Sequence, residues 1–185
     1  MMNQDQIHHL IDKSRQKDTQ AFALLVTEFQ EMVFRLAFRL LCDENEAKDI
    51  VQDTFVKVWL SIHKYDDSCR FSTWIYKITS NTCYDRLRSL QHLPSSYPAD
   101  MNPHIASEED IEESIVNKEL KDLILHFTEE LTPKQKLVFT LRDLEELEVE
   151  EVVTITGMSA DKIKHNLYQA RKQIRLKLNH IESGL

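Results

Sequence analysis

Apolar residues return every three or four positions over most of this chain, which is the spacing of helices that bury one face. Over Phe22–Leu40 the pattern runs without interruption and predicts one long helix buried along its length. Asp18 or Thr19 can cap its start, because a side-chain oxygen there accepts hydrogen bonds from free backbone amides. After a short break, a second helix is expected over Glu46–His63.

The second helix has one unusual face. Opposite its apolar side, two aliphatic residues are grouped with two carboxylates and an amide: Asp49, Gln52, Asp53, Val56 and Leu60. Single exposed aliphatic residues are common on protein surfaces and need no function. An apolar strip with an acidic rim is also a surface on which a partner helix docks. The sequence leaves both interpretations open.

A third helix is predicted over Phe71–Arg88, with two stripes of different chemistry. One stripe is apolar and faces a core: Phe71, Trp74, Ile75 and Ile78. The other places a cation, an amide, an aromatic ring and a second cation in a row, with Thr73 and Trp74 at its upper end: Lys77, Asn81, Tyr84 and Arg88. Phosphates need cations and unstacked bases need flat surfaces, so this row suits single-stranded nucleic acid. The simpler interpretation is a solvated face with Trp74 in the core.

The last part of the chain predicts a helix-turn-helix. A helix over Glu146–Ile155 is followed by Gly157 as the turn and by Ser159 as the cap of a long helix. The core side of that helix carries Ile163, Leu167, Ala170, Ile174 and Leu178. Its outer side carries polar and basic residues: Asp161, Lys164, His165, Tyr168, Arg171, Lys172 and Arg175. Such a helix enters the major groove while flanking cations hold phosphates, although glycine-turned hairpins also occur as plain scaffolds.

Composition and charge set the domain organisation. With only 2 Gly and 4 Pro in 185 residues, and little β-type alternation, the expected fold is all-α. Pro94, Pro98 and Pro103 interrupt packing, so we expect two small helical domains, residues 1–93 and 118–185, joined by a linker over 94–117. Residues 99–130 hold ten acidic residues and two lysines, so the net charge of this segment equals the net charge of the whole chain, -8. The segment 158–180 holds six bases against one acid and favours DNA.

Several classes of protein are disfavoured. There is no apolar run long enough to span a membrane and no signal-peptide core, so we expect a cytoplasmic protein without direct membrane insertion. Cys42, Cys69 and Cys83 lack metal spacing and are expected to be reduced, structural thiols. No glycine-rich phosphate loop or metal motif occurs, so no cofactor, metal or catalytic residue is predicted and an enzyme is the weakest hypothesis.

The order of these segments resembles the extracytoplasmic-function group of bacterial sigma factors, nearly from end to end. The most specific parts are DIVQDTFVKVW, which resembles the family's core-polymerase-binding helix, and FSTWIYKITSNTCYDRLR, which resembles its promoter-opening helix. The resemblance implies that Asp49, Gln52, Asp53, Val56 and Leu60 meet core RNA polymerase. It further implies promoter DNA as a ligand and an anti-sigma factor as a partner.

The resemblance also assigns two DNA-binding sets. The loop Tyr65–Ser72 and the helix after it would take up flipped bases of the minus-ten element, through Arg70, Phe71, Ser72, Thr73, Trp74, Lys77, Asn81, Tyr84 and Arg88. The long C-terminal helix would read the minus-thirty-five element, through Ser159, Lys162, Lys164, His165, Asn166, Tyr168, Gln169, Arg171, Lys172 and Arg175. The chain departs from the family after Arg88, where SLQHL replaces further basic residues, so phosphate contact there should be weaker.

Asp85 is expected on the core-facing side of its helix, paired with Arg35 or Arg39, because a buried carboxylate needs a partner. The predicted function is a sigma factor that places core polymerase on a promoter and captures melted bases. The alternative is a stand-alone helix-turn-helix regulator, which would need neither the acid-rimmed strip nor a platform for single strands.

Overall fold

The computed structural model describes residues 2–92, 125–128 and 130–182, and all regular elements within these ranges are helical. The all-α prediction is therefore confirmed. The elements are α1 (Gln4–Arg15), α2 (Thr19–Leu41), α3 (Glu44–Ser61), η1 (Ile62–Lys64), α4 (Phe71–His92), α6 (Pro133–Phe139), η2 (Thr140–Leu144), α7 (Val149–Thr156) and α8 (Ala160–Glu182). The predicted linker over 94–117 lies outside the described residues, and the predicted domain boundaries remain a prediction.

Short polar side chains fix where the helices begin. Asp18 caps α2, and its carboxylate accepts hydrogen bonds from the backbone amides of Gln20 and Ala21 at 2.9 and 3.0 Å. Cys42 adopts a left-handed conformation, with φ of 54°, and ends α2. Asp43 then caps α3 by accepting from the amide of Glu46, so α3 begins two residues before the predicted start. Gly157, with φ of 69°, makes the predicted turn between α7 and α8.

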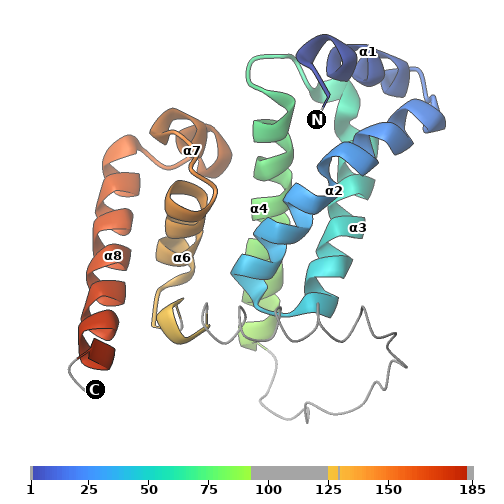
Figure 1. Ribbon diagram of the computed structural model, residues 1–185. Coiled ribbons are helices and arrows are strands. Elements are labelled where there is room, and N and C mark those ends of the chain that lie inside the picture. Colours follow the sequence, from blue (N-terminus) through green and yellow to red (C-terminus); the bar gives the residue numbers. More distant parts are fainter. Residues whose placement is uncertain (1, 93–124, 129, 183–185) are drawn as a thin grey trace.

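The helices form two groups that stand side by side (Figure 1). In one group α2, α3 and α4 pack together and α1 lies across their upper end; in the other, α6 and α7 pack against α8. The core of the first group includes Leu25, Val33, Val58 and Ile75, all at most 1 % exposed. This core packs against the first turns of α4 and fixes the loop that precedes this helix.

A second core joins the two groups. Leu36 of α2 and Tyr76 of α4 belong to the same buried cluster as Leu141 of η2 and Ile155 of α7. Leu36 and Leu141 are fully buried, and burial of such a side chain stabilises a structure by about 1.5–3 kcal/mol. The C-terminal helices therefore lie directly on α2 and α4.

One predicted core position on α8 is wrong. Ile163, Leu167 and Ala170 are buried as expected, but Leu178 is 43 % exposed. A helix turns 100° per residue, so fifteen positions carry Leu178 roughly 60° away from the line that starts at Ile163.

Among the residues that the structure describes, no helix combines the length and the apolar character needed to cross a membrane.

Candidate partner-binding and nucleic-acid-binding surfaces

The predicted strip of α3 lies on the outer face of the first helical group. While Ile50, Phe55 and Val58 of α3 enter the core, five residues point outward, and we call them the α3 strip: Asp49, Gln52, Asp53, Val56 and Leu60. Val56 is 58 % exposed and Leu60 is 63 % exposed. Two aliphatic side chains so open to water, one turn apart and beside carboxylates, form a surface suited to a partner helix.

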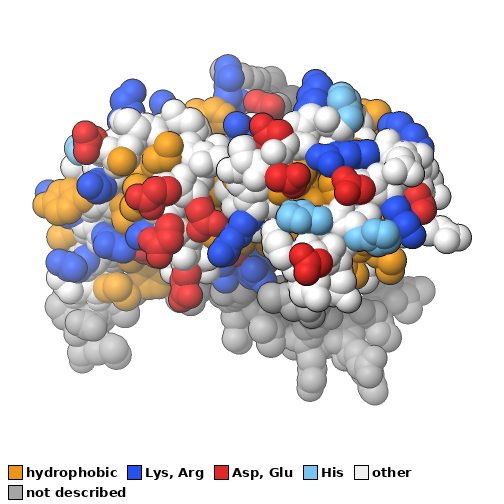
Figure 2. Space-filling view, turned by 90° about the horizontal axis from the view of Figure 1, so that it is seen from above, with side chains coloured by type: hydrophobic (Ala, Val, Ile, Leu, Met, Phe, Trp, Pro, Cys, Tyr) orange, Lys and Arg blue, Asp and Glu red, His pale blue; other side chains and the backbone are white. Residues whose placement is uncertain are grey.

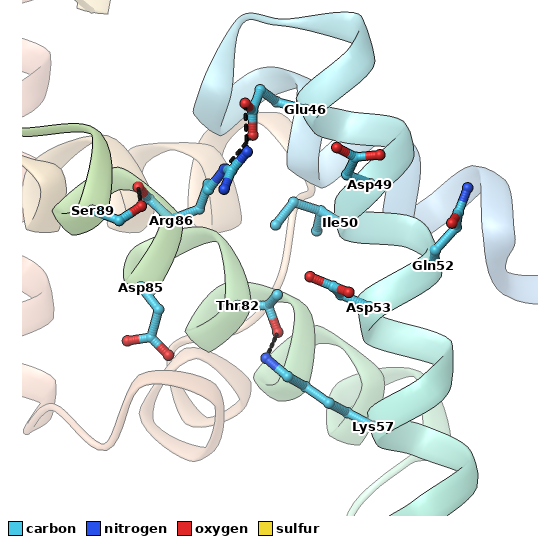
Figure 3. Close-up of a pocket in the computed structure, with 10 residues that line it drawn as sticks. All are labelled: Glu46, Asp49, Ile50, Gln52, Asp53, Lys57, Thr82, Asp85, Arg86 and Ser89. Carbon is cyan, nitrogen blue, oxygen red and sulfur yellow. Dashed lines mark hydrogen bonds and ion pairs between the residues drawn. The ribbon is translucent and has the colours of Figure 1, made fainter. Parts of the chain in front are cut away.

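A groove of about 380 Å³ continues the acidic end of this strip onto α4 (Figure 3). Both cations in the groove are already engaged. Arg86 makes two hydrogen bonds to Glu46, which raise the pKa of its guanidinium, and Lys57 donates to the Thr82 hydroxyl at 2.9 Å. The carboxylates of Asp49 and Asp53 make no direct hydrogen bond or ion pair within the described ranges. The groove is therefore left with uncompensated negative charge toward solvent.

The prediction for Asp85 is wrong. Asp85 is exposed and lines the α4 side of the same groove. The buried line of α4 runs through Phe71, Ile75 and Thr79, and Asp85 lies beside this line on the exposed surface. The carboxylate that pairs with Arg35 and Arg39 comes from Glu145, in the C-terminal helices. No local sequence pattern could have indicated this partner, because more than one hundred residues separate it from the arginines.

The predicted polar row on α4 lies at the surface, and we call it the α4 stripe: Lys77, Asn81, Tyr84 and Arg88. Lys77, Asn81 and Arg88 are exposed, whereas Tyr84 is half-buried. The chain thus presents two cations, an amide and part of a tyrosine side chain along three turns of a helix. Three of the four side chains are open to solvent and Tyr84 is partly so, which lets a single strand reach the row.

The loop before α4 is held in place by buried groups. The Tyr65 hydroxyl donates to the carbonyl of Cys69 at 2.7 Å, and burial raises the pKa of Tyr65 to about 12. Phe71 is 1 % exposed and packs edge-on against Phe29, with the two ring centroids 5.5 Å apart. Phe71 therefore anchors the loop in the core, while Arg70 is exposed beside it.

The upper end of the predicted minus-ten set is partly covered. Trp74 is half-buried and stacks on Phe71, with centroids 5.7 Å apart, which matches the core interpretation for much of its ring. Thr73 is 2 % exposed, and its hydroxyl donates to Glu151 of α7 at 3.2 Å. No local sequence pattern predicts this contact between α4 and α7. Ser72 is half-buried at the edge of a cavity that Arg70 also lines.

The outer face of α8 is open along its length. The exposed members of the predicted minus-thirty-five set are Ser159, Lys162, Lys164, His165, Tyr168, Arg171, Lys172 and Arg175, and the half-buried ones are Asn166 and Gln169. Arg171 makes a bidentate pair with Asp143, at 2.8 and 2.6 Å, which raises its pKa. Arg175 has no hydrogen bond or ion pair in the described structure, so its guanidinium is available to a phosphate.

Two sequence families match the parts of the chain that carry these surfaces. Sigma-70 region 2 matches residues 25–92, and Sigma-70 region 4 matches residues 121–174. The chain is 30 % identical over 169 residues to the RNA polymerase sigma factor SigV of Bacillus subtilis, covering 90 % of this chain and 96 % of that protein. The chain belongs to the extracytoplasmic-function sigma factors of the sigma-70 family. Its function is that of an RNA polymerase sigma factor, and the stand-alone regulator is not favoured.

One further sigma factor is similar to this chain in sequence, and two solved structures share its fold. The ECF RNA polymerase sigma factor SigW of B. subtilis is 26 % identical over 184 residues, covering 92 % of this chain and 96 % of that one. Among solved structures, CnrH in complex with the cytosolic domain of CnrY matches with a TM-score of 0.70 at 18 % identity, over 95 % of this chain and 98 % of CnrH. The sigma factor RpoE of Bartonella quintana, in complex with the anti-sigma factor NepR, matches with a TM-score of 0.63 at 22 % identity, over 88 % and 98 %.

Proposed function

We propose that this sigma factor divides its work among three surfaces. The α3 strip binds core RNA polymerase, the α4 stripe and the loop before it capture the opened minus-ten element, and α8 reads the minus-thirty-five element. Residues 1–93 and 118–185 would be the two domains that carry these surfaces, joined by the linker 94–117. The observation that carries the proposal is the exposure of Val56 and Leu60 among carboxylates, on a chain that also presents a helix-turn-helix. A regulator that acted without polymerase would have no use for that strip.

The α4 stripe has the groups that a melted strand requires. Lys77 and Arg88 can pair with phosphates, Tyr84 can stack with an unpaired base, and the Asn81 amide can both donate to and accept from a base edge. Phe71 is buried, so its role in the minus-ten set is to position Arg70 and Ser72 rather than to touch DNA. Trp74 keeps part of its ring at the surface and can take the base next to the loop.

We also propose an anti-sigma factor as the regulator of this protein and the cytoplasm as its place of action, where it would act by binding rather than as an enzyme. The support for the regulator is the shared fold with CnrH and RpoE, whose structures contain CnrY and the anti-sigma factor NepR. A partner that covered the α3 strip would compete directly with polymerase.

Run-off transcription with core polymerase and genomic fragments tests the function as a whole. The protein should direct discrete transcripts that core enzyme alone does not make, and it should copurify with core. Binding to duplex DNA without any association with core polymerase would contradict the proposal.

We predict that Asn81→Ala acts on opened DNA rather than on duplex. The loss of a base contact should weaken open-complex formation by about 1–3 kcal/mol, while duplex binding by α8 is unchanged. Permanganate reactivity of unpaired thymines measures the opened state. Ser89→Ala is the matched control, because Ser89 is exposed on the groove side of the same helix.

The loss in Asn81→Ala should remain on a pre-melted template, because the missing contact is to the single strand itself. An equal fall in duplex affinity, or full recovery on the pre-melted template, would show that Asn81 does not bind opened bases.

A further inference from the structure

The carboxylate of Glu145 is buried between the two helical groups. Its side chain is 2 % exposed, and it comes from the turn after η2. Arg35 of α2 donates to it at 3.1 Å, Arg39 of α2 makes a second ion pair, and the Tyr76 hydroxyl of α4 donates to it at 2.7 Å. We call these four residues the Glu145 cluster. The cluster ties the C-terminal helices to both α2 and α4.

The cluster satisfies every group it buries. A carboxylate removed from water is costly unless it is paired and hydrogen-bonded, and here three donors surround it. Arg39 also donates to the carbonyl of Leu144 at 2.8 Å. Burial and the hydrogen bond to Glu145 raise the pKa of Tyr76, so the phenol stays a donor at all physiological pH values. Since all three donors come from the N-terminal helices, the carboxylate keeps these partners only while the groups are in contact.

The contact covers part of the predicted minus-ten surface. Thr73 is buried beneath Glu151, and Glu148, Glu150 and Glu151 line a shared pocket with Arg70. Seen from above, acidic side chains gather on the side of the molecule where α7 lies (Figure 2). Carboxylates beside Arg70 compete with phosphates for its charge and repel a DNA strand that approaches the loop.

The same contact cannot persist on a promoter. The minus-ten and minus-thirty-five elements of a promoter are named for positions about 25 base pairs apart. This separation is roughly 85 Å of duplex at 3.4 Å per base pair. Thr73 and Glu151 are 3.2 Å apart here. About thirty residues separate the end of α4 from the next described range, which begins at residue 125, and any chain of that length can span roughly 100 Å. Separation of the helical groups is therefore both required and sterically permitted.

We infer that the free sigma factor inhibits itself through the Glu145 cluster, which holds the C-terminal helices against the minus-ten surface until the two groups separate. This inference rests on the proposed assignment of the α4 region to opened DNA. Opening removes three glutamates from the neighbourhood of Arg70 and releases Arg35, which lines a common cavity with Arg70, for contact with phosphates. Only open molecules bind a DNA strand at this surface, so the apparent affinity for DNA equals the affinity of the open state multiplied by the open fraction.

Glu145→Gln in the full chain tests the inference, because it keeps the shape of the side chain and removes its charge. Glu146→Gln is the matched control, since Glu146 is adjacent, exposed and equally charged. Small-angle X-ray scattering measures the size of the protein without DNA. Fluorescence anisotropy with a labelled random-sequence single-stranded 12-mer measures access to the minus-ten surface. We expect Glu145→Gln to enlarge the radius of gyration and to tighten binding at least about fivefold, and Glu146→Gln to change neither.

An unchanged radius of gyration in Glu145→Gln, with native helical circular dichroism, overturns the inference, and so does expansion without tighter binding. If Glu145→Gln loses helical signal, Tyr76→Phe decides between these outcomes, because it removes one donor and leaves the core volume intact. The scattering result does not depend on polymerase or promoter, so failure of the proposed function would appear in run-off transcription alone.

Discussion

Reversing the charge of Asp49 and Asp53 together should abolish binding to core RNA polymerase. Both carboxylates are exposed and make no direct ion pair in the described structure, so their attraction is available to a partner. Breaking a desolvated charge pair at an interface costs about 2–5 kcal/mol. Two such losses amount to roughly 4 kcal/mol or more, close to a thousandfold in Kd. Fluorescence anisotropy of labelled protein with core enzyme measures this difference.

The control for this variant is Asp5→Lys with Asp12→Lys. These residues are exposed on α1 and carry the same change of charge, but they lie outside the α3 strip. The helical circular-dichroism signal should be native in both double variants, because none of the four side chains is buried. Equal affinity of the two double variants for core enzyme would show that the α3 strip is only a solvated face.

The sequence was sufficient for the parts of the fold that depend on local chemistry. Asp18 and Gly157 act where capping and turn rules place them, and the spacing of apolar residues separates the buried side of α3 from its exposed strip. Val56 and Leu60 could be identified in advance because helical spacing places them on the same face as Asp49, Gln52 and Asp53, opposite the apolar side. Periodicity of this kind reports which face of a helix is apolar.

Periodicity does not report which other element covers a polar side chain. Thr73 has a neutral local context, yet Glu151 buries it from a distance of 78 residues in sequence. The assignment of Asp85 failed for the same reason, since the arginines of α2 are paired by Glu145 and not by a neighbour on α4. Glu145 itself stands among several glutamates of similar appearance, and only the contact between the helical groups distinguishes it. The closed arrangement was thus beyond local inference.

Two kinds of substitution on α8 should impair DNA binding in different ways. Arg175→Ala should weaken binding to all upstream elements alike and reduce the salt dependence by about one unit of slope, because a lost phosphate contact carries no sequence information. Arg171→Ala should weaken DNA binding less than Arg175→Ala does. Arg171 makes two hydrogen bonds to Asp143 and must break them before it can contact a phosphate. Titrations of the full chain with duplex upstream elements at several salt concentrations give both quantities.

His165 and Asn166 should instead determine which upstream element is preferred. His165 is exposed near the start of α8, and the half-buried Asn166 has an amide that donates to the carbonyl of Lys162 at 2.7 Å, which fixes its orientation and leaves its oxygen free to accept from a base. Each lost base contact should cost roughly 1–3 kcal/mol for the preferred element and less for others. Selection from a randomised upstream element compares the wild type with the His165→Ala, Asn166→Ala double variant. We expect the double variant to select a broader set of sequences while it keeps the salt slope of the wild type, because the phosphate contacts of Arg175 and Lys172 are intact. An unchanged preferred sequence would mean that this face of α8 holds DNA without reading it.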